Sequence, residues 1–191
     1  HTIKRFFTST EKVNIILVLP EEQIERWHQL CEKYSFSIPH VIVSGGNNRF
    51  QSVRNGLNSI GETSGLVAIH DGVRPFISKR VIEESYSIAE KKGNAVAAVE
   101  LKDSIRLIHG TENKSVDRTK YKIVQTPQTF QIQQIRDAFH KAQHMDFTDD
   151  ASVSEAAGYA VELIEGSYDN IKITTPEDLA MAESILKKFE Y

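Results

Sequence analysis

Short apolar runs alternate with longer amphipathic segments along most of this sequence. The runs end at polar residues, glycine or proline, which is typical of strands buried on both faces of a parallel sheet. The predicted strands cover residues 13–19, 40–43, 66–69, 95–99, 121–124, 160–164 and 170–174. Apolar residues at every third or fourth position predict helices at 21–34, 50–60, 79–92 and 132–142, just after 148–152, and from 176 onward. This alternation implies parallel strands joined by right-handed crossovers in an α/β sandwich.

The strand at 66–69 leads directly into a polar stretch, residues 70–75, with the sequence His-Asp-Gly-Val-Arg-Pro. Ligands of open α/β sheets bind beyond the carboxyl ends of the strands, so Asp71 is a candidate site residue. Gly72 would let a ligand approach the backbone closely, and Arg74 adds a fixed positive charge. Alternatively, Asp71 and Gly72 form an ordinary turn, and Arg74 simply pairs with Asp71.

Residues 100–122 interrupt the alternation of strands and helices. They read as a β-hairpin with a polar tip near 110–114, and charged and apolar residues are mixed on both of its faces. Such a hairpin cannot bury itself well alone. It is either an arm that packs on a second subunit or a hairpin folded back on its own sheet.

Further candidate residues lie where other predicted elements begin or end. Gly45 and Gly46 precede a helix start, an arrangement that presents backbone amides to phosphates, although the P-loop lysine is missing. Arg118 and Lys172 lie near strand ends and suit a phosphate, or else they are solvated surface charges. Thr148 or the following aspartate would cap a short helix.

Composition narrows the class of protein. The 191 residues are 40% hydrophobic and 26% charged with a net charge of −3, which favours one globular domain and argues against nucleic-acid binding. A single cysteine, Cys31, excludes a disulfide framework, and its place beside Trp27 predicts core packing. The longest apolar run, 15–19, is too short to cross a bilayer. We expect a cytoplasmic protein.

The sequence contains no Ser-His-Asp order of a nucleophilic triad, no pair of histidines at zinc-binding spacing and no glycine fingerprint of an oxidoreductase. A phosphate monoester is mostly dianionic at neutral pH, so it can itself be the nucleophile. Such a reaction needs charge neutralisation and alignment more than a catalytic base.

Seven motifs occur in register along the whole chain. They lie at 45–53, 70–75, 102–104, 116–118, 125–128, 148–152 and 169–178. Together they resemble the 2-C-methyl-D-erythritol 4-phosphate cytidylyltransferases of the non-mevalonate isoprenoid pathway. The resemblance implies one domain over residues 1–191, a three-layer Rossmann-like nucleotidyltransferase sandwich of the nucleotide-sugar-transferase type. It also implies a homodimer that exchanges the arm at 100–122.

The resemblance also implies roles for individual residues. The cytidylyl group of CTP would pass to methylerythritol phosphate, with Mg²⁺ bound mainly through the CTP phosphates and no protein ligand assigned. The residues expected to line the CTP pocket are Gly46, Asn47, Ser52 and Gly72. The expected catalytic residues are Asp71, Arg118 and Lys172, and the expected substrate-binding residues are Arg74, Ser104, Thr126 and Thr148. Ser104 and Arg118 would reach across from the partner's arm. Ser104 stands where the family usually has threonine, and Asn47 where some members have an acid.

The family pattern begins with a strand and a glycine-rich loop that wraps the CTP phosphates and carries a catalytic arginine and lysine. This sequence starts after that loop, at His1. We expect the segment to precede it in the protein, because loss of a central strand would leave the sheet poorly packed. The alternatives are a ribitol 5-phosphate cytidylyltransferase, a non-catalytic nucleotide-binding remnant, and a receiver-type domain with Asp71 as phospho-acceptor. The 116–118 motif favours the methylerythritol enzyme, and a receiver does not explain the arm.

Overall fold

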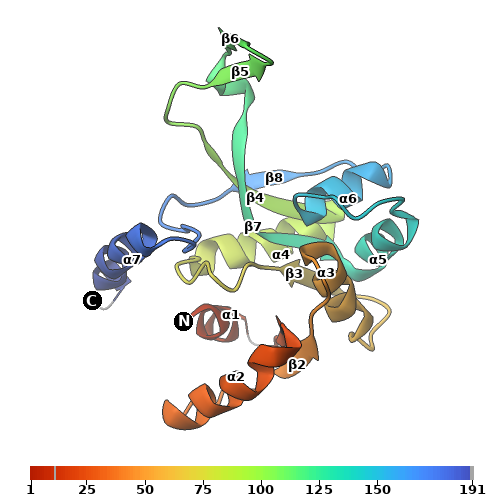
Figure 1. Ribbon diagram of the computed structural model, residues 1–191. Coiled ribbons are helices and arrows are strands. Elements are labelled where there is room, and N and C mark those ends of the chain that lie inside the picture. Colours follow the sequence, from red (N-terminus) through yellow and green to blue (C-terminus); the bar gives the residue numbers. More distant parts are fainter. Residues whose placement is uncertain (11, 190–191) are drawn as a thin grey trace.

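The computed structural model describes residues 1–10 and 12–189, which form a four-stranded and a two-stranded β-sheet with helices around them, and a third, two-stranded sheet in a projecting arm (Figure 1). The larger sheet has four strands, in the order β3 (Leu66–Ile69), β7 (Lys122–Gln131), β4 (Asn94–Glu100) and β8 (Leu163–Glu165). The smaller one pairs β1 (Ile16–Leu19) with β2 (Val41–Ser44) in parallel. No helix in the described ranges is long and apolar enough to cross a membrane.

Helices cover both faces of the larger sheet and create three layers (Figure 1). On β4, Val96 packs into one apolar cluster and its neighbours Ala95 and Ala97 pack into another, as the alternation of side chains along a strand requires. The first cluster belongs to α3 (Arg49–Asn58), α5 (Ile132–Lys141) and α6 (Asp150–Ala156). The second belongs to α1 (Thr2–Ser9) and α4 (Lys79–Lys92). The expected α/β sandwich is confirmed.

Strand β7 corrects the expectation that all strands are parallel. It runs antiparallel to both of its neighbours, with Glu100 of β4 opposite Lys122 and Asn94 opposite Phe130. The reason is that the segment after β4 returns through a hairpin and not through a helical crossover. β7 also extends well beyond the predicted 121–124, because its polar residues are buried and hydrogen-bonded where a hydrophobic pattern would place a loop.

The arm consists of β5 (Arg106–His109) and β6 (Glu112–Ser115), which pair antiparallel and are followed by the short 3₁₀ helix η1 (Arg118–Lys120). It projects away from the larger sheet (Figure 1), so the reading in which it folds back on its own sheet is wrong. Leu107 and Ile108 of β5 are 52% and 65% exposed. The predicted hairpin is therefore confirmed, with an apolar surface that this chain does not cover.

The two sheets are separated by a cavity of about 1900 Å³ between β1 and β3. Within the described residues β1 pairs only with β2, and β3 pairs only with β7, so each strand has an unpaired edge. Helix α2 (Glu21–Lys33) has no buried residue, and Trp27 and Cys31 line the cavity. The prediction of core packing for Cys31 is wrong, because this side chain is only partly buried and lines the cavity.

The segment 170–174, predicted as a strand, has no sheet partner. Its apolar residues Ile171 and Ile173 pack instead against a small cluster formed by Phe76 and two residues of α7 (Pro176–Phe189). One backbone hydrogen bond, from Ile173 N to Val73 O at 3.0 Å, ties the segment to the loop after β3.

Candidate active site

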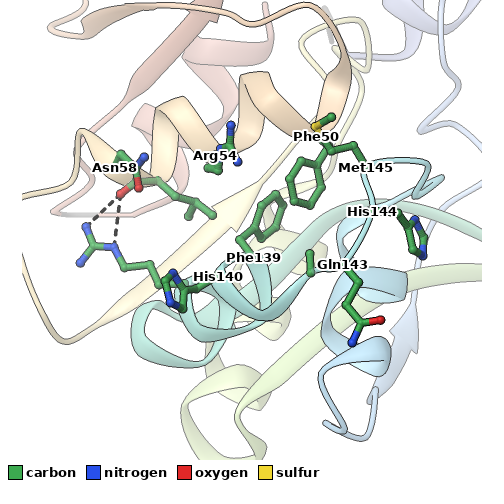
Figure 2. A pocket seen from close by; sticks show the side chains of 11 residues that line it. Phe50, Arg54, Asn58, Phe139, His140, Gln143, His144 and Met145 are labelled. Carbon is green, nitrogen blue, oxygen red and sulfur yellow. Dashed lines mark hydrogen bonds between the residues drawn. The ribbon is translucent and has the colours of Figure 1, made fainter.

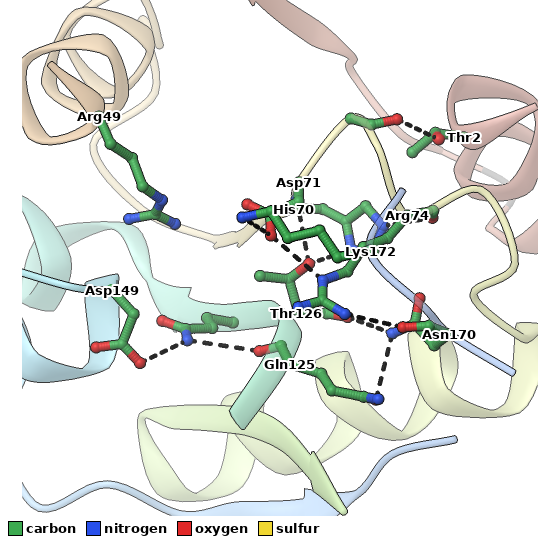
Figure 3. Close-up of polar contacts among 12 residues, drawn as sticks. Thr2, Arg49, His70, Asp71, Arg74, Gln125, Thr126, Asp149, Asn170 and Lys172 are labelled. Carbon is green, nitrogen blue, oxygen red and sulfur yellow. Dashed lines mark hydrogen bonds and ion pairs between the residues drawn. The ribbon is translucent and has the colours of Figure 1, made fainter. Parts of the chain in front are cut away.

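Asp71 follows β3 and lies between two cations, as Figure 3 shows. Its Oδ2 atom is 3.2 Å from Arg74 Nε and 3.2 Å from Lys172 Nζ. The side chains of Asp71 and Arg74 are 16% and 13% exposed, whereas that of Lys172 is 46% exposed. The expected pairing of Arg74 with Asp71 is thus confirmed, and a second cation, Lys172, joins them from a distant segment.

The electrostatics of this cluster keep Asp71 ionised. Burial favours its neutral form, but the Lys172 ammonium, the more distant Arg49 and the hydrogen bond from Arg74 outweigh burial and lower its pKa. Two cations and one carboxylate leave one net positive charge beside the cavity. Such a cluster suits a phosphate group, and Asp71 is already deprotonated at neutral pH.

Two contacts fix Lys172 relative to the loop after β3. Arg74 Nη1 donates to the backbone carbonyl of Asn170 at 2.9 Å, and the hydrogen bond between Ile173 and Val73 lies on the other side of Lys172. The segment that carries Lys172 is therefore held at the Asp71 loop although it belongs to no sheet.

Strand β7 brings Thr126 to the same loop. Thr126 is 4% exposed, and its hydroxyl oxygen is 3.1 Å from the Asp71 backbone nitrogen and 3.0 Å from His70 Nδ1. Two neighbours on β7 reach other loops. Gln125 Nε2 donates to Ser167 O at 2.9 Å, and Gln128 Nε2 donates to Asp149 Oδ2 at 2.9 Å.

Asp149, and not Thr148, caps α6. Its Oδ1 accepts from Ser152 N at 2.9 Å, while the exposed Thr148 hydroxyl lies 3.4 Å from Ser152 Oγ. Gln128 Oε1 also accepts from Ala151 N at 2.8 Å, so β7 holds the start of this helix from both sides. Thr148 is left at the surface beside the cap.

The loop before α3 folds onto its own helix. Gly46 N donates to Ser52 Oγ at 3.0 Å, and Asn47 N donates to Gln51 Oε1 at 2.8 Å. The expectation that these amides are free for phosphates is wrong, because side chains of the first helical turns already accept from them. An added Cβ at Gly46 would lie only 2.4 Å from Gln51 Cβ, so the tight loop needs glycine there.

An ion pair that we did not predict links α3 to α6. Arg49 Nη1 and Nη2 donate to Asp150 Oδ1 and Oδ2 at 2.9 and 2.6 Å. The Asp150 side chain is completely buried, and burial raises its pKa while the hydrogen bonds from Arg49 oppose that rise. Arg49 and Asp150 lie inside the motifs at 45–53 and 148–152, but the sequence around each residue does not indicate that the two form a pair.

The predicted arm residues lie apart from the Asp71 cluster within this chain. Arg118 is the first residue of η1, and its guanidinium donates to the backbone carbonyl of Lys102. Ser104 is exposed in the segment between β4 and β5. Gly72 remains close to Asp71, its carbonyl accepts from the Thr2 hydroxyl at 2.7 Å, and an added Cβ there would meet no protein atom within 4 Å.

The large cavity between β1 and β3 is the one that reaches the predicted residues. Its lining includes Arg49, Ser52, Asp71 and Gly72. A second cavity of about 500 Å³ lies between α3 and α5, where Phe50 and Phe139 stack (Figure 2), and none of the predicted site residues lines it. In the described ranges no three acidic, histidine or cysteine side chains are gathered as a metal site.

Comparisons with known proteins agree with this geometry. A family model described as 2-C-methyl-D-erythritol 4-phosphate cytidylyltransferase matches residues 1–188. The enzyme of that name from Bacteroides thetaiotaomicron is 44% identical over 186 residues, which is 97% of this chain and 84% of the relative. Its counterpart from Alkaliphilus oremlandii is 45% identical over 195 residues, 98% of this chain and 81% of the relative.

A solved structure is also similar over most of its length. The crystal structure of 4-diphosphocytidyl-2C-methyl-D-erythritol synthase from Anaerococcus prevotii matches with a TM-score of 0.87 at 28% identity, covering 97% of this chain and 84% of that one. Fold and site therefore define an α/β nucleotidyltransferase. The chain belongs to the 2-C-methyl-D-erythritol 4-phosphate cytidylyltransferase family, as the resemblance implied. The ribitol 5-phosphate and receiver-domain readings are not supported.

Proposed function

We propose that this protein transfers the cytidylyl group of CTP to 2-C-methyl-D-erythritol 4-phosphate in the non-mevalonate pathway. The products are 4-diphosphocytidyl-2-C-methyl-D-erythritol and pyrophosphate. Beyond family membership, the observation that carries the proposal is the net positive cluster of Asp71, Arg74 and Lys172, in which Asp71 lines the large cavity.

In this reaction an oxygen of the substrate phosphate forms a bond to the α-phosphorus of CTP. The bond from that phosphorus to the oxygen bridging to the β-phosphorus breaks, and the electron pair leaves with pyrophosphate. The phosphate nucleophile is already mostly dianionic, so Asp71 need not remove a proton. Lys172 and Arg74 hold the substrate phosphate, Asp71 keeps both cations in place beside the substrate, and Thr126 and Thr148 bind the substrate from β7 and the start of α6.

CTP would occupy the end of the cavity near the loop before α3. Gly46, Asn47 and Ser52 shape that loop, and Gly72 leaves room on the opposite side. Mg²⁺ would be held mainly by the triphosphate, because the described residues gather no cluster of metal ligands. When bound, the ion offsets the negative charge that the two phosphates bring together.

We further propose a cytoplasmic homodimer in which each chain, one domain over residues 1–191, lends its arm to its partner. The exposed apolar side chains of β5 need a cover, and Ser104 and Arg118 lie apart from their own chain's Asp71 cluster. Exchange of arms would bury these apolar side chains and complete each site with the partner's Ser104 and Arg118.

The test is pyrophosphate release by the protein expressed with its complete encoded N-terminus. Release is measured with CTP, Mg²⁺ and either methylerythritol phosphate or ribitol 5-phosphate. We expect release with the first acceptor, and a loss of about 10²–10³ in kcat/KM for Lys172→Ala. Lys79→Ala is the matched control, because Lys79 forms an exposed pair with Glu83 on α4 and should keep full activity. Release with ribitol 5-phosphate alone, or with neither acceptor, would contradict the proposal.

A further inference from the structure

His70 stands at the centre of the hydrogen bonds around Asp71, although sequence reasoning gave it no role (Figure 3). It is the first residue after β3, and its ring packs edge-on against Phe6 of α1 with a centroid distance of 4.9 Å. The ring thus has its plane fixed by one neighbour and both of its nitrogens within reach of polar atoms.

The partners of the two nitrogens determine where the ring carries its proton. Nε2 lies 3.0 Å from the backbone carbonyl of Arg74, which can only accept, so Nε2 carries the hydrogen. Burial lowers the pKa of His70 to about 4, which leaves the ring neutral at pH 7 and Nδ1 without a proton. Nδ1 therefore accepts from the Thr126 hydroxyl, 3.0 Å away.

These bonds join both ends of the turn from Asp71 to Arg74 to strand β7. The Thr126 oxygen, having donated its hydrogen to His70, accepts from the Asp71 backbone N–H at 3.1 Å. The other nitrogen of His70 holds the Arg74 carbonyl, and Arg74 N donates to Asp71 O at 3.0 Å, which closes the turn. The neutral ring therefore bonds on one side to Thr126 and on the other to the carbonyl of Arg74 at the end of the turn.

We propose that His70 is a positioning residue that fixes the Asp71–Arg74 turn against Thr126 and so aligns the substrate cluster. It makes no contact with the substrate itself, and it acts through its neighbours. The inference rests on the proposed function. A displacement of about 1 Å in such a cluster can cost a factor of 10² in rate.

Two isosteric substitutions separate the two bonds. In His70→Asn the side-chain oxygen takes the place of Nδ1, so the acceptor for Thr126 remains and the donor to Arg74 is lost. In His70→Gln the amide nitrogen takes the place of Nε2, so the donor remains and the acceptor is lost. We expect kcat with methylerythritol phosphate to fall about 10²-fold in His70→Ala and about tenfold in each isostere, with KM for CTP unchanged. The control is His140→Ala on the exposed side of α5, which should keep wild-type values.

The outcomes distinguish this inference from the proposed function. An inactive wild-type protein would refute the function, while nitrogen NMR of the ring still tests the inference, because it requires a neutral ring protonated on Nε2 from pH 7 to pH 5. A wild-type protein that is active alongside fully active alanine, asparagine and glutamine variants would overturn the role of His70. If His70→Ala does not fold, the test uses His70→Asn and His70→Gln, provided that their melting temperatures match that of the wild type. Partial activity in both supports the inference, and full activity in both refutes it.

Discussion

The ion pair between Arg49 and Asp150 allows a sharp prediction, because its two halves differ in exposure. The Asp150 side chain is 0% exposed and that of Arg49 is 35% exposed. Arg49→Met leaves a buried carboxylate without a partner, a loss that typically costs about 3–5 kcal/mol. Asp150→Asn leaves a guanidinium that can turn to water and an amide oxygen that still accepts from it, so about 1–2 kcal/mol is expected.

Urea and thermal unfolding of the two variants test this asymmetry. A domain of this size loses about 2–4 °C in melting temperature per kcal/mol, so Arg49→Met should melt about 6–20 °C lower and Asp150→Asn clearly less. The deficit of Arg49→Met should shrink as pH falls, because protonation removes the unpaired charge. The double variant Arg49→Met/Asp150→Leu should be more stable than Arg49→Met alone. Equal losses in the two single variants would refute the reasoning.

Two further predictions follow from the site. The pKa of His70 falls from 6.5 to about 4 on folding, so the unfolded chain takes up a proton that the folded one rejects. The free energy of unfolding should therefore be highest above about pH 6.5 and fall by about 3 kcal/mol toward pH 4. Urea titrations across this pH range should show a smaller fall for His70→Gln. An equal fall in the variant and the wild type would contradict this prediction. If arms are exchanged as proposed, Arg118→Ala and Lys172→Ala should each be severely impaired as pure dimers. A refolded 1:1 mixture should regain roughly a quarter of wild-type activity, because half the dimers rebuild one of two sites. No recovery would show that both residues serve the site of one chain.

The hydrophobic pattern correctly predicted those helices and strands in which buried residues recur at a regular spacing along the sequence. Helix α4 begins and ends at the predicted Lys79 and Lys92, and the apolar residues of α3 face the core as their spacing indicates. The pattern could not predict the length or direction of β7. Gln125, Thr126, Gln128 and Thr129 are buried there, and only partners from other segments explain their burial.

The candidate site, like the fold, could be predicted from the sequence only in part. Asp71 and Lys172 were expected beside the substrate with Arg74 as a further binding residue, and the structure brings these three together at the end of β3. Arg118, expected to act with them, lies on η1 away from this cluster in the same chain. Arg49 was missed, because its partner is 101 positions away and neither residue is unusual in its own helix. The glycine-rich segment expected before His1 stays a prediction.

Strand β7 connects the arm to the chemistry of the site. It leaves η1 at the base of the arm, pairs with β4 from Lys122 onward, and then presents Gln125, Thr126 and Gln128 to three separate loops. Through these contacts one strand orients the segment before Lys172, the turn at Asp71 and the cap of α6. A partner that binds the arm would therefore bind next to β7, the strand that holds the Asp71 turn and the segment before Lys172 in place. The proposed arm exchange would thus supply Arg118 to one site and also hold β7, and with it Thr126, in place in the other.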